Sequence, residues 1–199
     1  MKICVFDLSN PFHPRSKKIK MNLILESERL LLRPFEISDA EALFDMDKNP
    51  EVHYYLWQKP LTDIQEVYDY IAMVQQQYVD HNIGRFSTII KETGELIGWT
   101  GIKYVTGHIE NGNTNFYDYG YRLNEKFWNK GYATEASKVW LDYGFEKMKI
   151  EKINAYTHAQ NGASNYILQK IGFSFMEDYP DTSGVIWKWW QKNNPDFRL

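Results

Sequence analysis

Hydrophobic and polar positions alternate with regular periods from about residue 29 onward, and these periods predict a series of strands and helices. The apolar run over residues 29–35 predicts a strand that Pro34 ends. Apolar residues recur at a spacing of three and four from Ile64 to Tyr78, which predicts an amphipathic helix capped by Thr62. We expect the other elements to be a helix that Ser38 and Asp39 cap and that runs to residue 47, strands at 85–90, 96–105, 116–123, 152–156, 173–179 and 185–190, and helices at 133–148 and 161–171.

The order of these elements indicates a single domain of mixed α/β (α+β) class. One strand is followed by two helices, three strands, a helix, a strand, a helix and two strands. No Pro/Gly/Ser-rich linker and no internal repeat divides the series. A chain of 199 residues is long enough to bury a core of its own.

The first 21 residues differ from the rest because they follow neither period. They contain a basic cluster at residues 15–20, preceded by Pro11 and Pro14. We expect residues 1–21 to be a disordered basic extension, with Met21 as a plausible true start and residues 22–199 as the domain. A targeting arm or an RNA-contacting arm is the alternative interpretation.

Composition and charge limit the classes of partner. The chain is 43% hydrophobic and 25% charged, which is typical of an ordinary globular protein, and its formal net charge is −3. This charge does not favour DNA, and no apolar run is long enough to span a bilayer or to form a signal peptide. Cys4 is the only cysteine, which suits a reducing compartment, so we expect a cytoplasmic protein. The five histidines show no spacing typical of metal ligands, and we expect no metal.

The segment at residues 128–136 carries the clearest chemical signal. A short aromatic strand leads into Gly131, and a helix opens immediately after this glycine. Glycine lets the backbone approach a ligand closely because no Cβ intervenes. The first turn of a helix leaves N–H groups without partners at the positive end of the helix dipole. The combination predicts a binding site for an anion such as a pyrophosphate.

With these residues in view, the chain resembles the GNAT superfamily of N-acetyltransferases. Residues 128–133 (WNKGYA) occupy the place of that family's Arg/Gln-x-x-Gly-x-Gly/Ala signature. Asn161-x-x-Ser164, the Ile-Gly-Phe at 171–173 and the opening Glu-Arg-Leu-Leu-Leu-Arg-Pro at 28–34 extend the match. Among GNAT proteins, the chain is most similar to the branch typified by the ribosomal-protein N-terminal acetyltransferases RimJ and RimL.

This resemblance implies a fold and a cosubstrate. The fold would be a single GNAT domain, with a mixed, mostly antiparallel central sheet, helices on both faces and a splayed pair of strands at the cofactor site. The cosubstrate would be acetyl-CoA. The residues implied in its binding are Trp128, Asn129, Lys130, Gly131, Tyr132, Ala133, Thr134, Asn161 and Ser164. Asn161 is also well suited to cap the helix that follows it.

Asp118 is the candidate catalytic base. An attacking amine must be unprotonated, yet the pKa of an α-amino group is about 8 and that of a lysine about 10.4. Strand alternation places Asp118 on the opposite face from Tyr119 and Tyr121. Related proteins often carry glutamate here, so the shorter Asp118 favours a water relay. If Asp118 is instead a solvated strand carboxylate, deprotonation falls to ordered water or to Glu51 or His158.

Ser164 is the candidate donor to the CoA thiolate. Many GNAT proteins place a tyrosine acid at the position that Leu168 occupies here, and Tyr166 points to a different helix face. A thiol pKa of about 8.5 makes the thiolate a tolerable leaving group without a strong acid. The resemblance implies that a backbone N–H near Tyr119 stabilises the oxyanion.

Aromatic residues mark the candidate acceptor site. In the family, the two segments concerned usually wall this site, which implies roles for Tyr54, Tyr55, Trp57 and Tyr179. Core packing or a dimer surface is the competing interpretation, and it is the favoured one for Trp187 and Trp189, which share a strand face.

The resemblance therefore implies an N-acetyltransferase that moves acetyl from acetyl-CoA to a primary amine by direct attack. No cysteine outside the basic extension is available as a nucleophile. The acceptor is either a peptide N-terminus or a small molecule, and the protein is either a monomer or a homodimer. A catalytically inactive module that binds an acyl-CoA and regulates or scaffolds is the alternative function.

Overall fold

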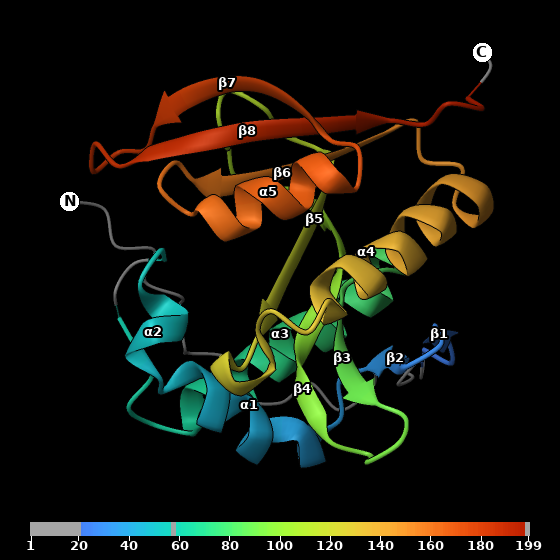
Figure 1. Cartoon of the computed structure of the whole chain (residues 1–199), viewed down its shortest axis with the longest axis vertical. Coiled ribbons are helices and arrows are strands. Elements are labelled where there is room, and N and C mark those ends of the chain that lie inside the picture. The colour runs from blue at the N-terminus through green and yellow to red at the C-terminus, as the bar shows by residue number, and fades with distance from the viewer. Residues whose placement is uncertain (1–20, 57–58, 198–199) are drawn as a thin grey trace.

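The chain folds around one eight-stranded sheet, seen in Figure 1. The computed structural model describes residues 21–56 and 59–197. The strand order in the sheet is β1-β2-β3-β4-β5-β6-β8-β7. The strands are β1 (Leu25–Glu26), β2 (Leu30–Pro34), β3 (Arg85–Ile90), β4 (Leu96–Val105), β5 (Phe116–Leu123), β6 (Lys152–His158), β7 (Ser174–Pro180) and β8 (Ile186–Asn193).

One junction in this sheet differs from the others. Every adjacent pair of strands is antiparallel except β5 and β6, which run parallel. This pair has only two registered positions, Tyr117 with Ile153 and Asp118 with Asn154, although the strands are eight and seven residues long. The strands therefore separate after Asp118, and Figure 1 shows β6, β8 and β7 turning away from the direction of β5.

Helices cover both faces of the sheet, as predicted. They are α1 (Ala40–Asp47), α2 (Pro50–His53), α3 (Gln65–His81), α4 (Tyr132–Asp142) and α5 (Gly162–Lys170), with short 3-10 turns at Ile37–Asp39 and Glu125–Phe127. Trp140 of α4 donates its indole N–H to Thr100 on one face of β4. Trp99, the residue before Thr100, points to the other face of β4, where it lies against Tyr70 of α3. The predicted fold class, a single α/β domain with a mixed, mostly antiparallel sheet and helices on both faces, is confirmed.

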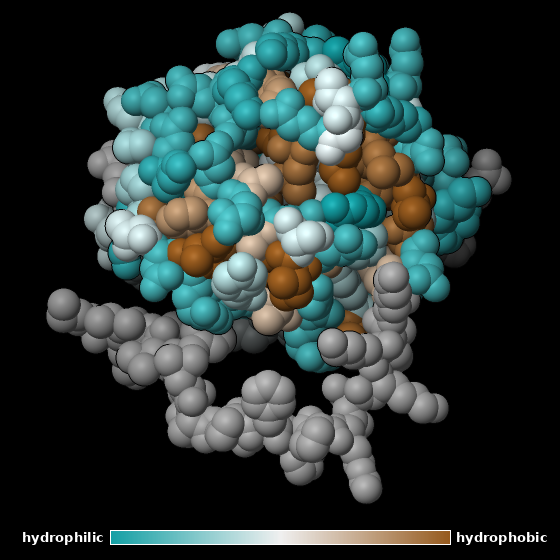
Figure 2. Space-filling view, turned by 90° about the horizontal axis from the view of Figure 1, so that it is seen from below, coloured by the Kyte–Doolittle hydropathy of each residue, from teal (hydrophilic) through white to brown (hydrophobic). Residues whose placement is uncertain are grey.

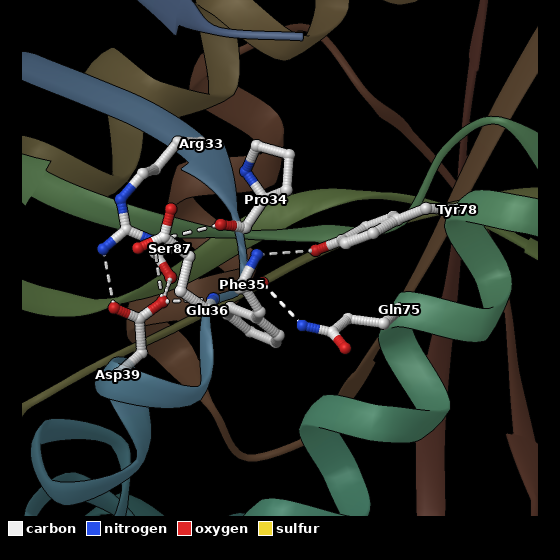
Figure 3. A network of polar contacts seen from close by, with 8 residues as sticks. All are labelled: Arg33, Pro34, Phe35, Glu36, Asp39, Gln75, Tyr78 and Ser87. Atoms are coloured by element: carbon white, nitrogen blue, oxygen red, sulfur yellow. Dashed lines mark hydrogen bonds and ion pairs between the residues drawn. The ribbon is translucent and has the colours of Figure 1, made fainter. Parts of the chain in front are cut away.

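The first helix is joined to the sheet by a buried polar network centred on Asp39 (Figure 3). Its carboxylate accepts hydrogen bonds from Arg33 at 2.6 and 2.8 Å, from Ser87 at 2.6 Å and from the backbone N–H of Glu36 at 2.9 Å. Asp39 lies at the N-cap of α1, but its side chain makes no capping hydrogen bond to that helix. The expected cap is instead an anchor that ties the turn before α1 to strands β2 and β3.

Two predicted helix boundaries differ clearly from the structure, and strand β1 was not predicted. Thr62 does not cap α3, which begins at Gln65 after an N-cap at Ile64; Asp63 accepts from the Gln65 backbone N–H at 2.9 Å instead. The helix expected at 133–148 ends as α4 at Asp142 and continues as a π-helical turn over Tyr143–Lys147. Strand β1 has only two residues, too few to show a period.

The hydrophobic core has a large part under α3 and α4 and a smaller part under the last two strands. The smaller cluster comprises Val105, Phe116, Tyr179, Trp187 and Trp189. Core packing, the interpretation favoured for the two tryptophans, agrees with their burial. Seen from below, hydrophobic residues form patches between hydrophilic side chains (Figure 2). Among the described residues, no helix is long and apolar enough to cross a membrane. Residues 1–20, including the expected basic extension, lie outside the described part of the chain.

Candidate active site

A cavity of about 910 Å³ opens where β5 and β6 separate. Its walls come from β3, β4, β5, β6 and β8, from α2, α3 and α5, and from the start of α4. A separation between two strands in mid-sheet exposes backbone groups that a continuous sheet would pair, so the gap offers hydrogen bonds to a ligand. The cavity is large enough for a cofactor arm together with a second small molecule.

Residues 129–134, which we call the cradle, form one end of the cavity. Gly131 has a φ of 82° and is the N-cap of α4, and Asn129 has a φ of 61°. A Cβ added at Gly131 would meet a guanidinium nitrogen of Arg29 at 3.4 Å and no other heavy atom within 4 Å. Left-handed residues beside a helix start turn successive N–H groups to one side, which is the geometry of an anion-binding nest.

The cradle is held from behind by Arg29, which immediately precedes β2. Arg29 donates through Nε to Glu135 at 2.7 Å and through a terminal nitrogen to the Lys130 carbonyl at 3.1 Å. Its guanidinium also lies 4.6 Å from the centre of the Tyr132 ring. Glu135 accepts from the Ser27 hydroxyl at 2.6 Å as well. Burial raises the pKa of Glu135, but the hydrogen bonds from Ser27 and Arg29 outweigh it, so the pKa is lowered.

Most residues predicted to bind the cosubstrate line this cavity. They are Trp128, Asn129, Gly131, Tyr132, Ala133, Thr134, Asn161 and Ser164. Lys130 is the exception: its ammonium lies 5.3 Å from the centre of the Phe127 ring, and the residue is not part of the cavity wall. The structure thus gathers two sequence segments, at 128–134 and 161–164, into one wall.

Ser164 belongs to a pair that the sequence did not indicate. Asn161 accepts from the Ser164 backbone N–H at 3.1 Å, so it caps α5 as expected. The Tyr121 hydroxyl donates to Ser164 Oγ at 3.1 Å. Burial raises the pKa of Tyr121 to about 12, so this phenol keeps its proton at neutral pH. Because Tyr121 supplies the donor in this bond, the proton of the Ser164 hydroxyl is free to point to another acceptor.

Asp118 is buried rather than solvated. Its carboxylate lies 2.5 Å from a guanidinium nitrogen of Arg85 and 3.8 Å from the Lys103 ammonium, and the residue is 3% exposed. The solvated strand carboxylate that we kept as an alternative is therefore excluded. Strand alternation is as predicted, since Tyr119 and Tyr121 point to α4 and α5 while Asp118 points to β3.

Arg85 organises what we call the inner end of the cavity, formed by Arg85, Trp99, Lys103 and Asp118. Arg85 also donates to the backbone carbonyls of Asp118, at 2.9 Å, and of Gly101. Its guanidinium lies 5.3 Å from the centre of the Trp99 ring. A Cβ on Gly120 would lie 2.8 Å from Arg85, so a larger residue there would displace the guanidinium. One signal was present in the sequence: an arginine opening an otherwise uncharged strand.

Aromatic side chains from the residues directly after α2, from β6 and from β8 form another part of the cavity wall. Tyr54 and Tyr55 line it, and the Tyr55 ring lies 5.5 Å from His158, which in turn lies 5.8 Å from Trp187. Tyr179 lies elsewhere: its ring packs in the smaller core cluster and its hydroxyl donates to Glu110 at 2.6 Å. The structure does not place Tyr179 in the acceptor wall as expected, because strand β7 turns this side chain inward. Trp57 lies outside the described residues.

Comparisons with known proteins converge on one family. A family model described as an acetyltransferase (GNAT) domain matches residues 29–174. The chain is 34% identical over 165 residues to the uncharacterized N-acetyltransferase p20 of Bacillus licheniformis, and the match covers 81% of this chain and 90% of that protein. It is 25% identical over 143 residues to the spermidine N(1)-acetyltransferase of Escherichia coli strain K12, covering 72% of each.

Solved structures show the same fold. An acetyltransferase of the GNAT family from Bacillus anthracis superposes with a TM-score of 0.72 at 23% identity, over 87% of this chain and 100% of that one. RimL, a ribosomal L7/L12 α-N-protein acetyltransferase solved with coenzyme A, gives 0.72 at 15% identity, over 86% and 98%. A spermidine N-acetyltransferase from Vibrio cholerae, solved with CoA and spermine, gives 0.67 at 17% identity, over 84% and 97%.

Proposed function

Because the chain belongs to the GNAT family of acetyltransferases, we propose that its cavity transfers acetyl from acetyl-CoA to a primary amine by direct attack. The chain is an acetyl-CoA-dependent acyltransferase, as its N-acetyltransferase homologues are. Family members in the comparisons carry names that specify spermidine and a ribosomal protein as acceptors. The acceptor of this chain is either a small-molecule amine or a protein N-terminus.

In this proposal the pyrophosphate of acetyl-CoA lies at the cradle. The left-handed conformation of Gly131 turns its N–H group to the same side as those at the start of α4, and these groups are directed at the phosphates. The pantetheine arm then runs along the gap between β5 and β6, toward Asn161 and Ser164 at the start of α5. The single observation that carries the proposal is that the cradle and the gap open into one cavity.

The chemistry follows from the groups on either side of β5. The amine nitrogen forms a bond to the acetyl carbonyl carbon, its surplus proton passes through water to Asp118, and the C–S bond of the thioester breaks. A backbone N–H near Tyr119 stabilises the tetrahedral oxyanion. Ser164, held by the Tyr121 hydroxyl, donates to the departing thiolate. Asp118 can accept this proton only if its ion pair with Arg85 loosens as the amine binds.

The proposal also covers the branch of the family, the compartment, the oligomeric state and the extent of the domain. We place the chain in the RimJ/RimL-like branch on its motifs, in the cytoplasm, and as a monomer or homodimer without DNA or membrane partners. Residues 22–199 form the catalytic domain, and residues 1–21 an extension to it. We expect no metal to take part, as the spacing of the histidines in the sequence indicates.

The test is acetyl-CoA turnover with an amine panel. Release of CoA thiol is followed with peptides, polyamines, amino acids and aminoglycosides, and acetyl-CoA binding is measured in parallel by calorimetry. Acetyl transfer to at least one amine is the expected result. Tight binding of acetyl-CoA without CoA release to any amine supports the alternative of an inactive binding module.

A further inference from the structure

The inner end of the cavity holds more positive than negative side chains. The lysines and arginines in the cavity wall are Arg85, Lys103, Arg122 and Lys170, whereas the carboxylates are Glu51 and Asp118. This surplus is unusual next to a site that must accept a cationic amine, because like charges repel most strongly where water is scarce.

Two of these cations are already neutralised. Arg85 is paired with Asp118 at 2.5 Å, and Arg122 is paired with Asp47 at 2.8 Å. Lys170, the last residue of α5, is exposed, so water screens its charge. Lys103 remains: among the described residues its ion pair is the 3.8 Å approach to Asp118, which is too long for a hydrogen bond. The Asp118 oxygen concerned already accepts from Arg85. Lys103 is therefore the surplus charge of this end.

No other carboxylate in the cavity wall compensates Lys103. Glu51 lies in the first turn of α2 and is exposed, so water screens its charge. Glu110 attracts Lys103 from behind the wall, but it does not line the cavity, and its carboxylate accepts from Tyr179 at 2.6 Å. Burial lowers the pKa of Lys103, which means that the folded protein leaves this ammonium incompletely stabilised.

A neutral donor lies in the same wall. Trp99 is 8% exposed, and its indole N–H is buried without a hydrogen-bond partner among the described residues. Gln77, also in the wall, has a buried side-chain oxygen without a partner in the described structure. Both atoms are buried inside the wall, so neither faces the open cavity, and Lys103 is the group that a ligand can reach.

We propose that the amine acceptor of this enzyme carries a carboxylate, which Lys103 binds at the inner end of the cavity. This inference rests on the proposed function, since it specifies the acceptor of that acetyl transfer. The carboxylate brings the charge that the inner end lacks, and the neighbouring amine remains free to face the thioester. A polyamine, by contrast, brings further positive charge to a wall that already has a surplus.

The experiment compares amines that differ only in the carboxylate. Glycine, β-alanine and γ-aminobutyrate are paired with methylamine, ethylamine and propylamine, L-phenylalanine is paired with phenylethylamine, and spermidine represents polycations. We expect at least one acid to exceed its partner by about tenfold to a hundredfold in kcat/KM, the range for a hydrogen bond to a charged group. The length series separates an α-carboxylate from one placed further from the amine.

Lys103→Met should abolish this preference, and Lys103→Arg should retain part of it, while acetyl-CoA affinity stays unchanged in both. Lys188→Met is the matched control, because Lys188 is equally exposed at 25% and lies in the same sheet outside the cavity. Three results would overturn the inference: equal turnover of acids and amines, a preference for spermidine, or a preference that survives Lys103→Met. Each would still show that the protein is an acetyltransferase. If no amine is acetylated, the proposed function fails, and calorimetric titration of γ-aminobutyrate against propylamine into the CoA-bound protein still decides the carboxylate preference.

Discussion

Arg29 and Glu135, separated by 106 residues in the chain, form a two-point ion pair behind the cradle. Glu135 lies in the first turn of α4, and the same arginine donates to the Lys130 carbonyl one residue before Gly131. The edge of the sheet thereby fixes both the start of the helix and the loop that precedes it. An anion-binding site needs its N–H groups in place before the ligand arrives, so this pair should contribute to cosubstrate affinity.

Arg29→Met tests this contribution. Because the side chain is 45% exposed, we expect a modest loss, about fivefold in acetyl-CoA affinity by calorimetry. Lys91→Met is the control: Lys91 pairs with Glu26 at 2.6 Å at the same edge of the sheet but makes no recorded contact with α4. If both variants bind acetyl-CoA as the wild type does, the cradle does not depend on Arg29.

Gly131→Ala tests the cradle itself. A residue with a side chain is strained at a φ of 82°, by about 1 kcal/mol, and its Cβ would press on Arg29, which holds the cradle, at 3.4 Å. Gly184→Ala imposes the same strain at a φ of 86° in an open turn, where a Cβ meets no atom within 4 Å. Thermal shift with and without acetyl-CoA should show that both variants melt lower and that only Gly131→Ala loses stabilisation by the ligand. An undiminished shift in Gly131→Ala would contradict the assignment.

Local patterns predicted the parts of this fold that depend on local sequence. The strand at 116–123 and the strands at 85–90 and 96–105 have the predicted bounds, because each begins and ends at a turn that its neighbours specify. Gly172 ends α5 with a φ of 87°, as its place after the last apolar residue indicates. The start of α3 was placed wrongly at Thr62, because several neighbouring polar residues can serve as caps and tertiary packing decides among them.

The inner end of the cavity could not be predicted from the sequence. Asp118 meets Arg85 across 33 residues, and Tyr121 meets Ser164 across 43. Neither pair shares a helix face or a turn, so no period connects them; they meet only because β3, β4, β5 and α5 are placed together by the sheet. The burial of Asp118 has the same origin, and this is why a solvated carboxylate remained an alternative.

Ser164→Ala and Tyr121→Phe should produce similar, small defects in turnover. Each removes one hydrogen bond of the pair that we assign to the thiolate, and a thiolate leaves readily without strong assistance, so we expect a decrease in kcat of about threefold to tenfold. Tyr117→Phe is the control, since Tyr117 shares this face of β5 but does not line the cavity. The double variant should be no worse than either single variant; additive losses, measured by steady-state kinetics, would show that the two side chains act separately.

Asp47 should make stability depend on acid pH. Burial raises the pKa of this carboxyl, but the nearby His53, 3.6 Å away, and the hydrogen bond from Arg122 outweigh it, and the pKa is lowered. A lowered folded pKa gives stability that is present above the ordinary aspartate pKa and lost as pH falls through the folded value, with a slope of at most about 1.4 kcal/mol per pH unit. In urea unfolding between pH 6 and pH 3, Asp47→Asn should flatten this dependence, whereas Asp69→Asn on the exposed face of α3 should not. Equal slopes for wild type and Asp47→Asn would contradict the prediction.

Asp118→Asn separates the roles of this carboxylate in catalysis and in structure. If Asp118 is the proton acceptor, this replacement should lower kcat about a hundredfold and leave acetyl-CoA affinity intact. The defect should shrink as pH rises toward the pKa of the acceptor amine, because the amine then attacks without help. The replacement also weakens a buried ion pair with Arg85, so a loss of stability of about 3 kcal/mol is expected whatever the catalytic role.

Asp39→Asn supplies the control for that structural loss. Asp39 is as buried as Asp118, at 4% against 3%, and pairs with Arg33 at 2.6 Å, but it lies outside the cavity in the network of Figure 3. This variant should lose comparable stability and keep a kcat that is unchanged at every pH, measured well below its melting temperature. If Asp118→Asn behaves in the same way, the carboxylate only holds Arg85 in place. Deprotonation of the amine must then be assigned to ordered water, to Glu51 or to His158, the two titratable residues of the cavity wall that remain candidates.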